Sequence, residues 1–226
     1  MLMLQQGIAG HGYTVFAHQQ TAGKGQRGKA WDTEAQSNIL LSSVLDVSFL
    51  TLQQQFMLSA MVALAVHDFF SAHAGDATRI KWPNDIYWQN RKAGGILIEN
   101  VVRGSRWNWA IVGIGLNINQ ASFPEHLTRA VSLRQVTGQQ FDLPTLAMEL
   151  CACLEKHFKA FKEHGGIGII DSYNAHLFKR NEEVLLKKGD ELLPCVINAV
   201  DQEGQLLVSN DRYSHFRFGE VEWLFR

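Results

Sequence analysis

The chain has 226 residues, of which 46% are hydrophobic and 19% are charged, and its net charge is −1. This is the composition of an ordinary globular protein, long enough for one large domain or for one domain with a small module. The near-zero charge excludes a global attraction to nucleic acids or membranes, although it leaves room for a local basic patch. We predict no membrane span, because the longest apolar run is interrupted by His67 and Asp68 and is too short to cross a bilayer.

The cysteines and histidines predict neither disulfides nor a metal centre. Cys151, Cys153 and Cys195 fit neither an even disulfide set nor C-x-x-C metal spacing. The N-terminus lacks the basic leader and apolar core of a secretion signal, so we predict a reducing, cytoplasmic location. The nine histidines form no H-E-x-x-H motif and are interpreted as structural or surface residues.

Hydrophobic periodicity predicts alternating strands and helices along most of the chain. The clearest element is a helix over residues 51–73, with apolar residues at helical spacing and Thr51 as its N-cap. Residues 142–163 predict a second long helix, with Asp142 as its cap and Pro144 in its first turn. The remaining predicted elements are a helix tail at 1–9, strands at 13–20, 39–45, 93–102 and 107–119, a strand that starts at 78, turns at 83–85 and continues through 86–88, and a helix at 122–137.

The pattern changes near residue 180. From there on, four or five short strands alternate with the turn sequences KKGD, DQEG and SNDR, and no helical stretch occurs. Such spacing is typical of a small β-barrel. We therefore predict two domains, residues 1–179 and residues 180–226.

The stretch TAGKGQRGKAW, residues 21–31, matches both glycine-rich phosphate motifs, G-x-x-x-x-G-K and G-x-G-x-x-G. Both motifs require a helix that starts inside the glycine run, whereas an apolar strand follows here. Ala30 also stands where a P-loop has a magnesium-binding hydroxyl. Two interpretations remain: a solvated basic hairpin, or an anion site built from exposed amides with Lys24, Arg27 and Lys29.

The sequence KWPND places Lys81, Asn84 and Asp85 around a proline that stiffens the backbone. This corner is either a plain turn or a rigid holder for a phosphate, a ribose or a metal ion. The sequence AGGILIE follows Lys92 and indicates either a glycine bulge beside a surface lysine or a lysine that points along a bound ligand. The amides in GIGLNIN, Asn117 and Asn119, add donors and acceptors beside strand glycines.

These four segments, in this order and spacing, resemble the biotin protein ligases over nearly the whole chain. The resemblance implies an α/β (α+β) fold: a mixed β-sheet backed by helices, followed by a small SH3-like barrel. Some members of that family carry an N-terminal DNA-binding winged helix. No segment here resembles one, so a role in DNA binding is not expected.

The resemblance also implies a two-step reaction. Biotin and ATP with Mg²⁺ give biotinyl-5'-adenylate and pyrophosphate, and the acyl group then passes to one lysine of a biotin carboxyl carrier protein. The enzyme is expected to be cytoplasmic, independent of DNA and membranes, and either a monomer or a homodimer.

By the same resemblance, particular residues are expected at the two substrates. Lys92 and Asp85 are the expected catalytic residues, with Asp85 also a candidate Mg²⁺ ligand and proton acceptor. The expected biotin-binding residues are Gln20, Gly23, Lys24, Gly25, Lys92 and Gly95. The expected ATP-binding residues are Gln26, Arg27, Lys29, Trp31, Lys81, Asn84, Asp85 and Asn117.

Two other functions fit parts of the pattern. A lipoate or octanoate ligase has the same fold and also uses a lysine near a glycine-rich strand, although KWPND and Trp31 favour biotin. A non-catalytic module that binds a phosphate metabolite through the basic loop would bind without releasing pyrophosphate.

The chain departs from the family pattern in two places. Lys24, Gln26 and Lys29 stand where the family commonly has arginines, and neither lysine nor glutamine holds phosphate oxygens in pairs, so we expect the adenylate to be held less tightly. The family's Ser/Thr-Thr/Ser-Asn motif, which meets the ureido group of biotin, has no counterpart upstream of Gln20. We expect the chain to be shortened and to bind biotin at least tenfold more weakly than an extended form, unless Gln20 carries more of the recognition.

Overall fold

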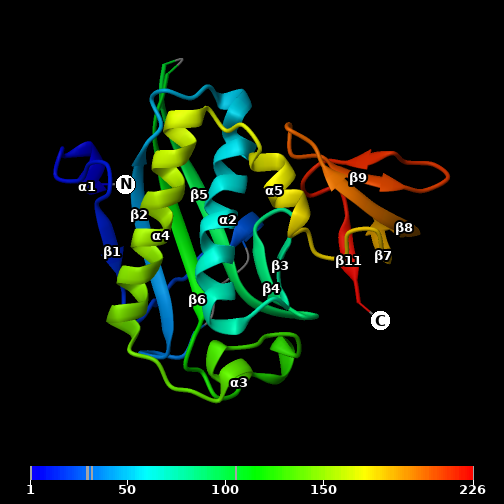
Figure 1. The fold of residues 1–226 in the computed structure, drawn as a ribbon, viewed down its shortest axis with the longest axis horizontal. Coiled ribbons are helices and arrows are strands. Elements are labelled where there is room, and N and C mark those ends of the chain that lie inside the picture. The colour runs from blue at the N-terminus through cyan, green and yellow to red at the C-terminus, as the bar shows by residue number, and fades with distance from the viewer. Residues whose placement is uncertain (1, 29–30, 32, 105, 226) are drawn as a thin grey trace.

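The structure, a computed structural model, describes residues 2–28, 31, 33–104 and 106–225. It consists of a six-stranded sheet with two long helices on one face, and a smaller five-stranded sheet at the C-terminal end (Figure 1). The predicted α+β class is therefore confirmed.

All five strand pairings of the large sheet are antiparallel. Among the described residues, its parallel pairings are confined to isolated bridges at Ile80–Leu177 and Lys92–Ala130, so the mixed character expected of this sheet is slight. Hairpin connections explain the pairings β3–β4, β4–β5 and β5–β6, because strands joined by short turns must run in opposite directions. In spatial order the strands are β1 (Thr14–Phe16), β2 (Asn38–Asp46), β6 (Arg106–Asn117), β5 (Arg91–Arg103), β4 (Asp85–Trp88) and β3 (Thr78–Lys81).

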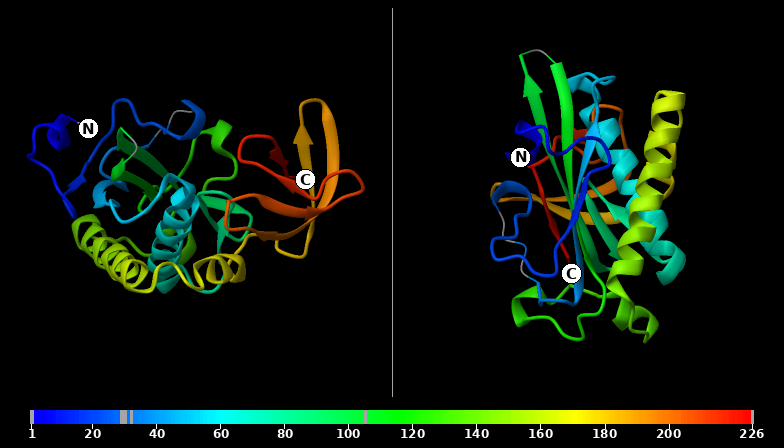
Figure 2. Two further views of the ribbon diagram at one scale, coloured as in Figure 1. Left: turned by 90° about the horizontal axis from the view of Figure 1, so that it is seen from above. Right: turned by 90° about the vertical axis from the view of Figure 1, so that its left-hand side faces the viewer.

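Helices α2 (Gln55–Ala74) and α4 (Leu143–His164) cover one face of this sheet, and the N-terminal glycine-rich segment lies on the other (Figure 2, right). Helix α4 begins where predicted, since the Asp142 carboxylate accepts a hydrogen bond from the Thr145 amide at 3.0 Å. Thr51 caps a short 3₁₀ turn, η2 (Leu52–Gln54), that leads into α2. A short helix, α1 (Leu2–Gln5), lies at the N-terminus.

Helix α2 is apolar around most of its circumference because it lies between the sheet, α4 and α5 (Ile169–Ala175). The stretch Leu52–Ala74 spans 23 residues and is long and apolar enough to cross a membrane, which corrects the expectation that it is too short. Most of it is nevertheless buried inside the protein. Its hydrophobicity is thus accounted for by the core.

One helical prediction was wrong and one helix was missed. Residues 122–137 do not form one helix but a 3₁₀ turn, η3 (Glu125–Leu127), and a short α3 (Leu133–Thr137), because Ser132 caps a new helix by accepting from the Gln135 amide. Helix α5 was not predicted, since its seven residues are too few for a clear period. Three glycines with positive φ, Gly165, Gly166 and Gly168, separate it from α4.

The C-terminal sheet has five antiparallel strands, the upper of the two numbers predicted. Asn174 of α5 anchors it, since its side chain donates to the Val200 carbonyl at 2.9 Å and accepts from the Val200 amide at 2.7 Å. Trp82 adds a bond from its indole N–H to the Gly204 carbonyl at 3.0 Å. In spatial order the strands are β10 (His215–Phe216), β9 (Leu206–Ser209), β8 (Glu191–Val200), β7 (Glu183–Lys188) and β11 (Glu222–Leu224).

Candidate active site

A cavity of about 1040 Å³ lies on the face of the large sheet opposite α2 and α4. The register of the strands sets its floor: Gly115 of β6 lies between Leu40 of β2 and Gly95 of β5, and Gly95 lies beside Asp85 of β4. Because side chains alternate between the faces of a strand, these four positions form one row on the cavity side. Two adjacent glycines leave the backbone bare at the centre of that row.

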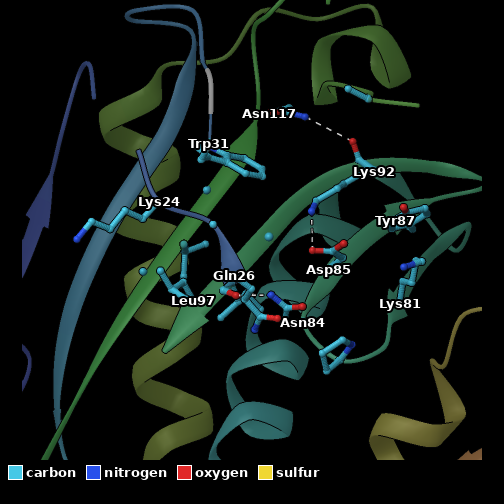
Figure 3. Close-up of a pocket in the computed structure, with 18 of the residues that line it drawn as sticks. Lys24, Gln26, Trp31, Lys81, Asn84, Asp85, Tyr87, Lys92, Leu97 and Asn117 are labelled. Carbon is cyan, nitrogen blue, oxygen red and sulfur yellow. Dashed lines mark hydrogen bonds and ion pairs between the residues drawn. The ribbon is translucent and has the colours of Figure 1, made fainter. Parts of the chain in front are cut away.

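Lys92 and Asp85 form an ion pair above this row, with 2.7 Å between Nζ and the carboxylate (Figure 3). Their side chains are 34% and 18% exposed, so the pair is partly shielded from water while still reaching the cavity. The backbone of Lys92 is fixed on both sides: its amide donates to Arg129 and its carbonyl accepts from Val131. The ammonium group is therefore held at a defined place in the cavity wall.

The KWPND corner is rigid. Asn84 donates from its side chain to the Ile96 carbonyl, and its own carbonyl accepts from the Ile96 amide. The Pro83 carbonyl accepts a hydrogen bond from the buried Tyr173 hydroxyl at 3.1 Å. This network holds Asp85 at the cavity through its neighbour, so the corner does more than reverse the chain.

The glycine-rich loop folds over the cavity and closes on itself where the Trp31 amide donates to the Gly23 carbonyl at 2.9 Å. The Trp31 ring lies directly on Gly115: a β-carbon there would be 2.6 Å from the ring. The Lys92 ammonium lies 5.5 Å from the centre of that ring. The indole N–H is buried without a hydrogen-bond partner in the described part of the chain, which leaves a donor for an incoming ligand.

Most of the predicted substrate-binding residues come together around this cavity. Gly23 does not line it but supports Trp31, and Asn117 donates to the Val131 carbonyl at 3.2 Å, behind Lys92. Lys29 and the side chain of Arg27 lie outside the described residues. The predicted residues that line the cavity are Gln20, Lys24, Gly25, Gln26, Trp31, Lys81, Asn84, Asp85, Lys92, Gly95 and Asn117.

Two residues singled out in the sequence serve packing instead. Asn119 bonds to the backbone of Phe141 in both directions and so braces the segment before α4. Gly94 faces away from the cavity, where a β-carbon would be 2.3 Å from the Leu116 side chain. Of the glycine pair, only Gly95 opens the floor to a ligand.

The C-terminal sheet contributes a wall of the cavity that the sequence did not reveal. The Lys81 ammonium lies 4.9 Å from the ring centre of Trp223 and 5.8 Å from that of Phe225, and the Arg129 guanidinium lies 4.4 Å from Phe225. Such cation–π contacts join β11 to the KWPND corner. These aromatic residues lie more than 130 positions away from Lys81, and no local motif marks them.

Tyr87 belongs to the same wall and stays neutral. Burial, followed by the negative charge of Asp85, raises the pKa of Tyr87 far above its ordinary value. In the described part of the chain, no group of three His, Cys, Asp or Glu side chains could hold a metal ion. A Mg²⁺ ion at Asp85 would therefore need phosphate oxygens among its ligands, as is usual for this ion.

Together these features define a class of site: a glycine floor on which the Trp31 ring lies, with a fixed cation at one end and a loop closing over it. A family model described as the biotin/lipoate A/B protein ligase family matches residues 3–117, which include β1 to β6 and every floor strand. The chain belongs to this family.

Individual curated proteins with similar sequences agree with this family assignment. The bifunctional ligase/repressor BirA of Bacillus spizizenii is 36% identical over 160 residues, which cover 70% of this chain and 49% of the relative. The biotin–[acetyl-CoA-carboxylase] ligase of Paracoccus denitrificans is 29% identical over 92% of this chain and 88% of its own length. The chain thus spans about half the length of some of the curated relatives it matches.

A solved structure shares the fold over most of its length. The biotin protein ligase of Aquifex aeolicus in complex with biotin and ATP has a TM-score of 0.80 and 25% sequence identity, with 96% of this chain and 90% of that one covered.

Proposed function

We propose that the protein is a biotin protein ligase, which activates biotin with ATP and transfers it to a lysine of a biotin carboxyl carrier protein. The observation that carries this proposal is the Lys92–Asp85 pair beside the bare Gly95 and Gly115 backbone. Family membership and the biotin ligases among its relatives support it.

In the first step, a biotin carboxylate oxygen attacks the α-phosphorus of ATP, and the bond to the pyrophosphate oxygen breaks. Lys92 is suited to both partners, since its ammonium holds the attacking carboxylate and meets the charge that builds on the phosphoryl oxygens. Asp85 orients that ammonium at 2.7 Å. Lys24 and Gln26 also line the cavity, and Figure 3 shows Gln26 beside Leu97 and Asn84.

Mg²⁺, when bound with ATP, neutralises phosphate charge, and Asp85 is the side chain that would hold it. Trp31, Asn84 and Asn117 would bound the nucleotide, and Lys81 would face its phosphates from the aromatic wall. Gln20 and the backbone of Gly23–Gly25 would lie along biotin. Lys29 and Arg27 would supply further charge on the loop.

In the second step, the acceptor lysine amine attacks the acyl carbon of the adenylate, and AMP leaves. The amine must lose protons, because the ordinary lysine pKa is near 10.4. Asp85 is the carboxylate at the site that would accept one. We further propose a cytoplasmic enzyme, monomeric or homodimeric, whose domains are residues 1–179 and a barrel-like module at 180–226.

The test is to incubate the full chain with ATP, Mg²⁺ and biotin, lipoate or octanoate, and to detect the acyl-adenylate by mass and pyrophosphate by a coupled assay. Biotinyl-adenylate, followed by a biotin-sized mass increase on a carrier domain, is the expected result. Adenylates of lipoate or octanoate alone would identify a lipoyl ligase. Binding without pyrophosphate would identify a non-catalytic module.

A further inference from the structure

The cavity floor continues beyond the glycine row. Two residues further along the strands, Ser42 of β2 pairs with Gly113 of β6, and Gly113 pairs with Leu97 of β5. All three line the cavity, and the alternation of side chains puts them on the same face as Gly95 and Gly115. This second row lies about 7 Å from the first, at roughly 3.3 to 3.4 Å per strand residue.

A ligand whose carboxylate sits at Lys92 has one direction in which to extend. On one side, the backbone of Lys92 is bonded to Arg129 and Val131, so that segment closes the cavity there. On the other side, the floor runs from Gly95 towards Leu97, which Figure 3 shows further along β5 from Lys92. The Trp31 ring lies on the glycine row itself, so the far end of the ligand would meet the second row.

Ser42 is the polar side chain of that second row. It is half-buried, and no hydrogen-bond partner for its hydroxyl occurs among the described residues. Leu97 beside it is apolar, and Gly113 has no side chain to fill the space between them. A hydroxyl can both donate and accept a hydrogen bond, so Ser42 offers the far end of a ligand a polar contact from the floor, beside the apolar Leu97 and the bare Gly113.

The next residue provides an internal comparison. Ser43 points to the helix side, is 3% exposed, and already accepts a hydrogen bond from the Thr14 hydroxyl at 3.0 Å. The two adjacent serines of β2 thus differ in role: the Ser43 hydroxyl has a hydrogen-bond partner within the fold, and Ser42 is directed into the cavity.

We propose that Ser42 is a specificity-determining residue that hydrogen-bonds the polar ring end of the acid substrate, the ureido group of biotin. This inference rests on the proposed function. Lipoate and octanoate end in a dithiolane ring or an alkyl chain and offer no comparable donor or acceptor. A site that hydrogen-bonds its substrate rejects analogues that leave the bond unmade, so Ser42 would select biotin over these acids.

The experiment is a calorimetric titration of the full chain with biotin in the absence of ATP. Ser42→Ala should weaken biotin binding about three- to tenfold, the range for one neutral hydrogen bond. Ser42→Ala should weaken the binding of desthiobiotin, which keeps the ureido group, by the same factor. Ser43→Ala is the matched control and should bind biotin like the native chain. Ser42→Leu, which fills the second row, should weaken binding by more than tenfold.

Turnover gives a second readout. In Ser42→Ala the KM for biotin should rise by the same factor, while kcat at saturating biotin and the KM for ATP stay within about twofold, since the contact is made equally in ground and transition states. Native affinity in Ser42→Ala, or an equal loss in Ser43→Ala, would overturn the assignment. Tight biotin binding by the native chain without pyrophosphate release would refute the ligase function but not the role of Ser42. Absence of biotin binding by the native chain would refute both the ligase function and the role of Ser42.

Discussion

The two faces of strands β5 and β6 are built from alternate residues of the same strands over Gly94–Leu97 and Val112–Leu116, yet they have opposite roles. The helix face carries Ile96, Val112, Ile114 and Leu116, all at most 4% exposed and packed in the core under α2 and α4. The cavity face carries Gly95, Gly113 and Gly115, with Leu97 between them. The first face stabilises the fold, and the second has no side chains at its glycines, so that the Trp31 ring lies directly on the backbone beside the cavity.

Truncating a buried side chain on the helix face should have the largest effect on stability. Ile114→Ala removes a side chain that is 2% exposed and should lower the free energy of unfolding by about 2–5 kcal/mol, since the cavity left behind collapses only in part. Urea denaturation measures this. Ile167, which is 88% exposed, gives the control Ile167→Ala, expected to change stability by less than about 0.5 kcal/mol. A similar small loss for both would mean that the helix face is not the stabilising one.

The largest catalytic effect is expected at Lys92. Lys92→Ala should slow adenylate formation by about 10²-fold or more, because one preorganised charge at the reacting groups is lost. Single-turnover pyrophosphate release is the measurement. Lys156→Ala, at an exposed position on α4, is the control and should react at the native rate. Near-native release in Lys92→Ala would remove Lys92 from the mechanism.

The glycine floor gives a smaller and more specific effect. Gly115→Ala places a methyl group 2.6 Å from the Trp31 ring, so the ring must move, and we expect kcat/KM to fall about tenfold, or about 1.4 kcal/mol. The same substitution in a Trp31→Ala background should cost much less, because residues in contact are coupled. Additive losses in that double-mutant cycle would show that the two residues act independently.

The smallest effect concerns acid stability of the helix layer. On α2, Asp68 accepts hydrogen bonds from the His157 and His67 rings at 2.9 and 3.1 Å, and these bonds hold the pKa of Asp68 well below its usual value. A lowered carboxylate pKa stabilises the fold at neutral pH, and this contribution is lost as the pH falls below about 4.

Asp68→Asn should therefore be less stable than the native chain at pH 7, with the difference shrinking towards pH 3 in denaturation curves. Asp190→Asn, on the turn between β7 and β8, is the control. A difference between Asp68→Asn and native chain that is the same at pH 7 and pH 3 would contradict this assignment.

Local sequence determined much of the fold. Helix α2 follows from a long apolar stretch preceded by the 3₁₀ turn that Thr51 caps, and α4 follows from a long apolar period with its cap at Asp142. These signals lie within a few residues of the helices they specify. The prediction failed at residues 122–137, where a new cap at Ser132 and tertiary contacts divide the segment. It also missed α5, whose helix is too short to show a period.

Within the site, the sequence identified the residues whose chemistry is marked by neighbours: Lys92 before a glycine pair, Asp85 after a proline, and Trp31 after a glycine run. It did not show that Gly94 packs on Leu116 while Gly95 opens the floor, because the face of a strand residue depends on register and bulges.

Only the tertiary structure brought Ser42, Trp223 and Phe225 to the cavity. A serine in a buried strand and aromatic residues near the C-terminus are ordinary in any core. Their role arises from non-local pairing: Ser42 faces the cavity because β2 pairs with β6, and Trp223 faces it because β11 pairs with β7 beside Lys81. Cross-strand pairing joins residues that are far apart in the chain, so the local propensities of these residues do not predict which strands pair.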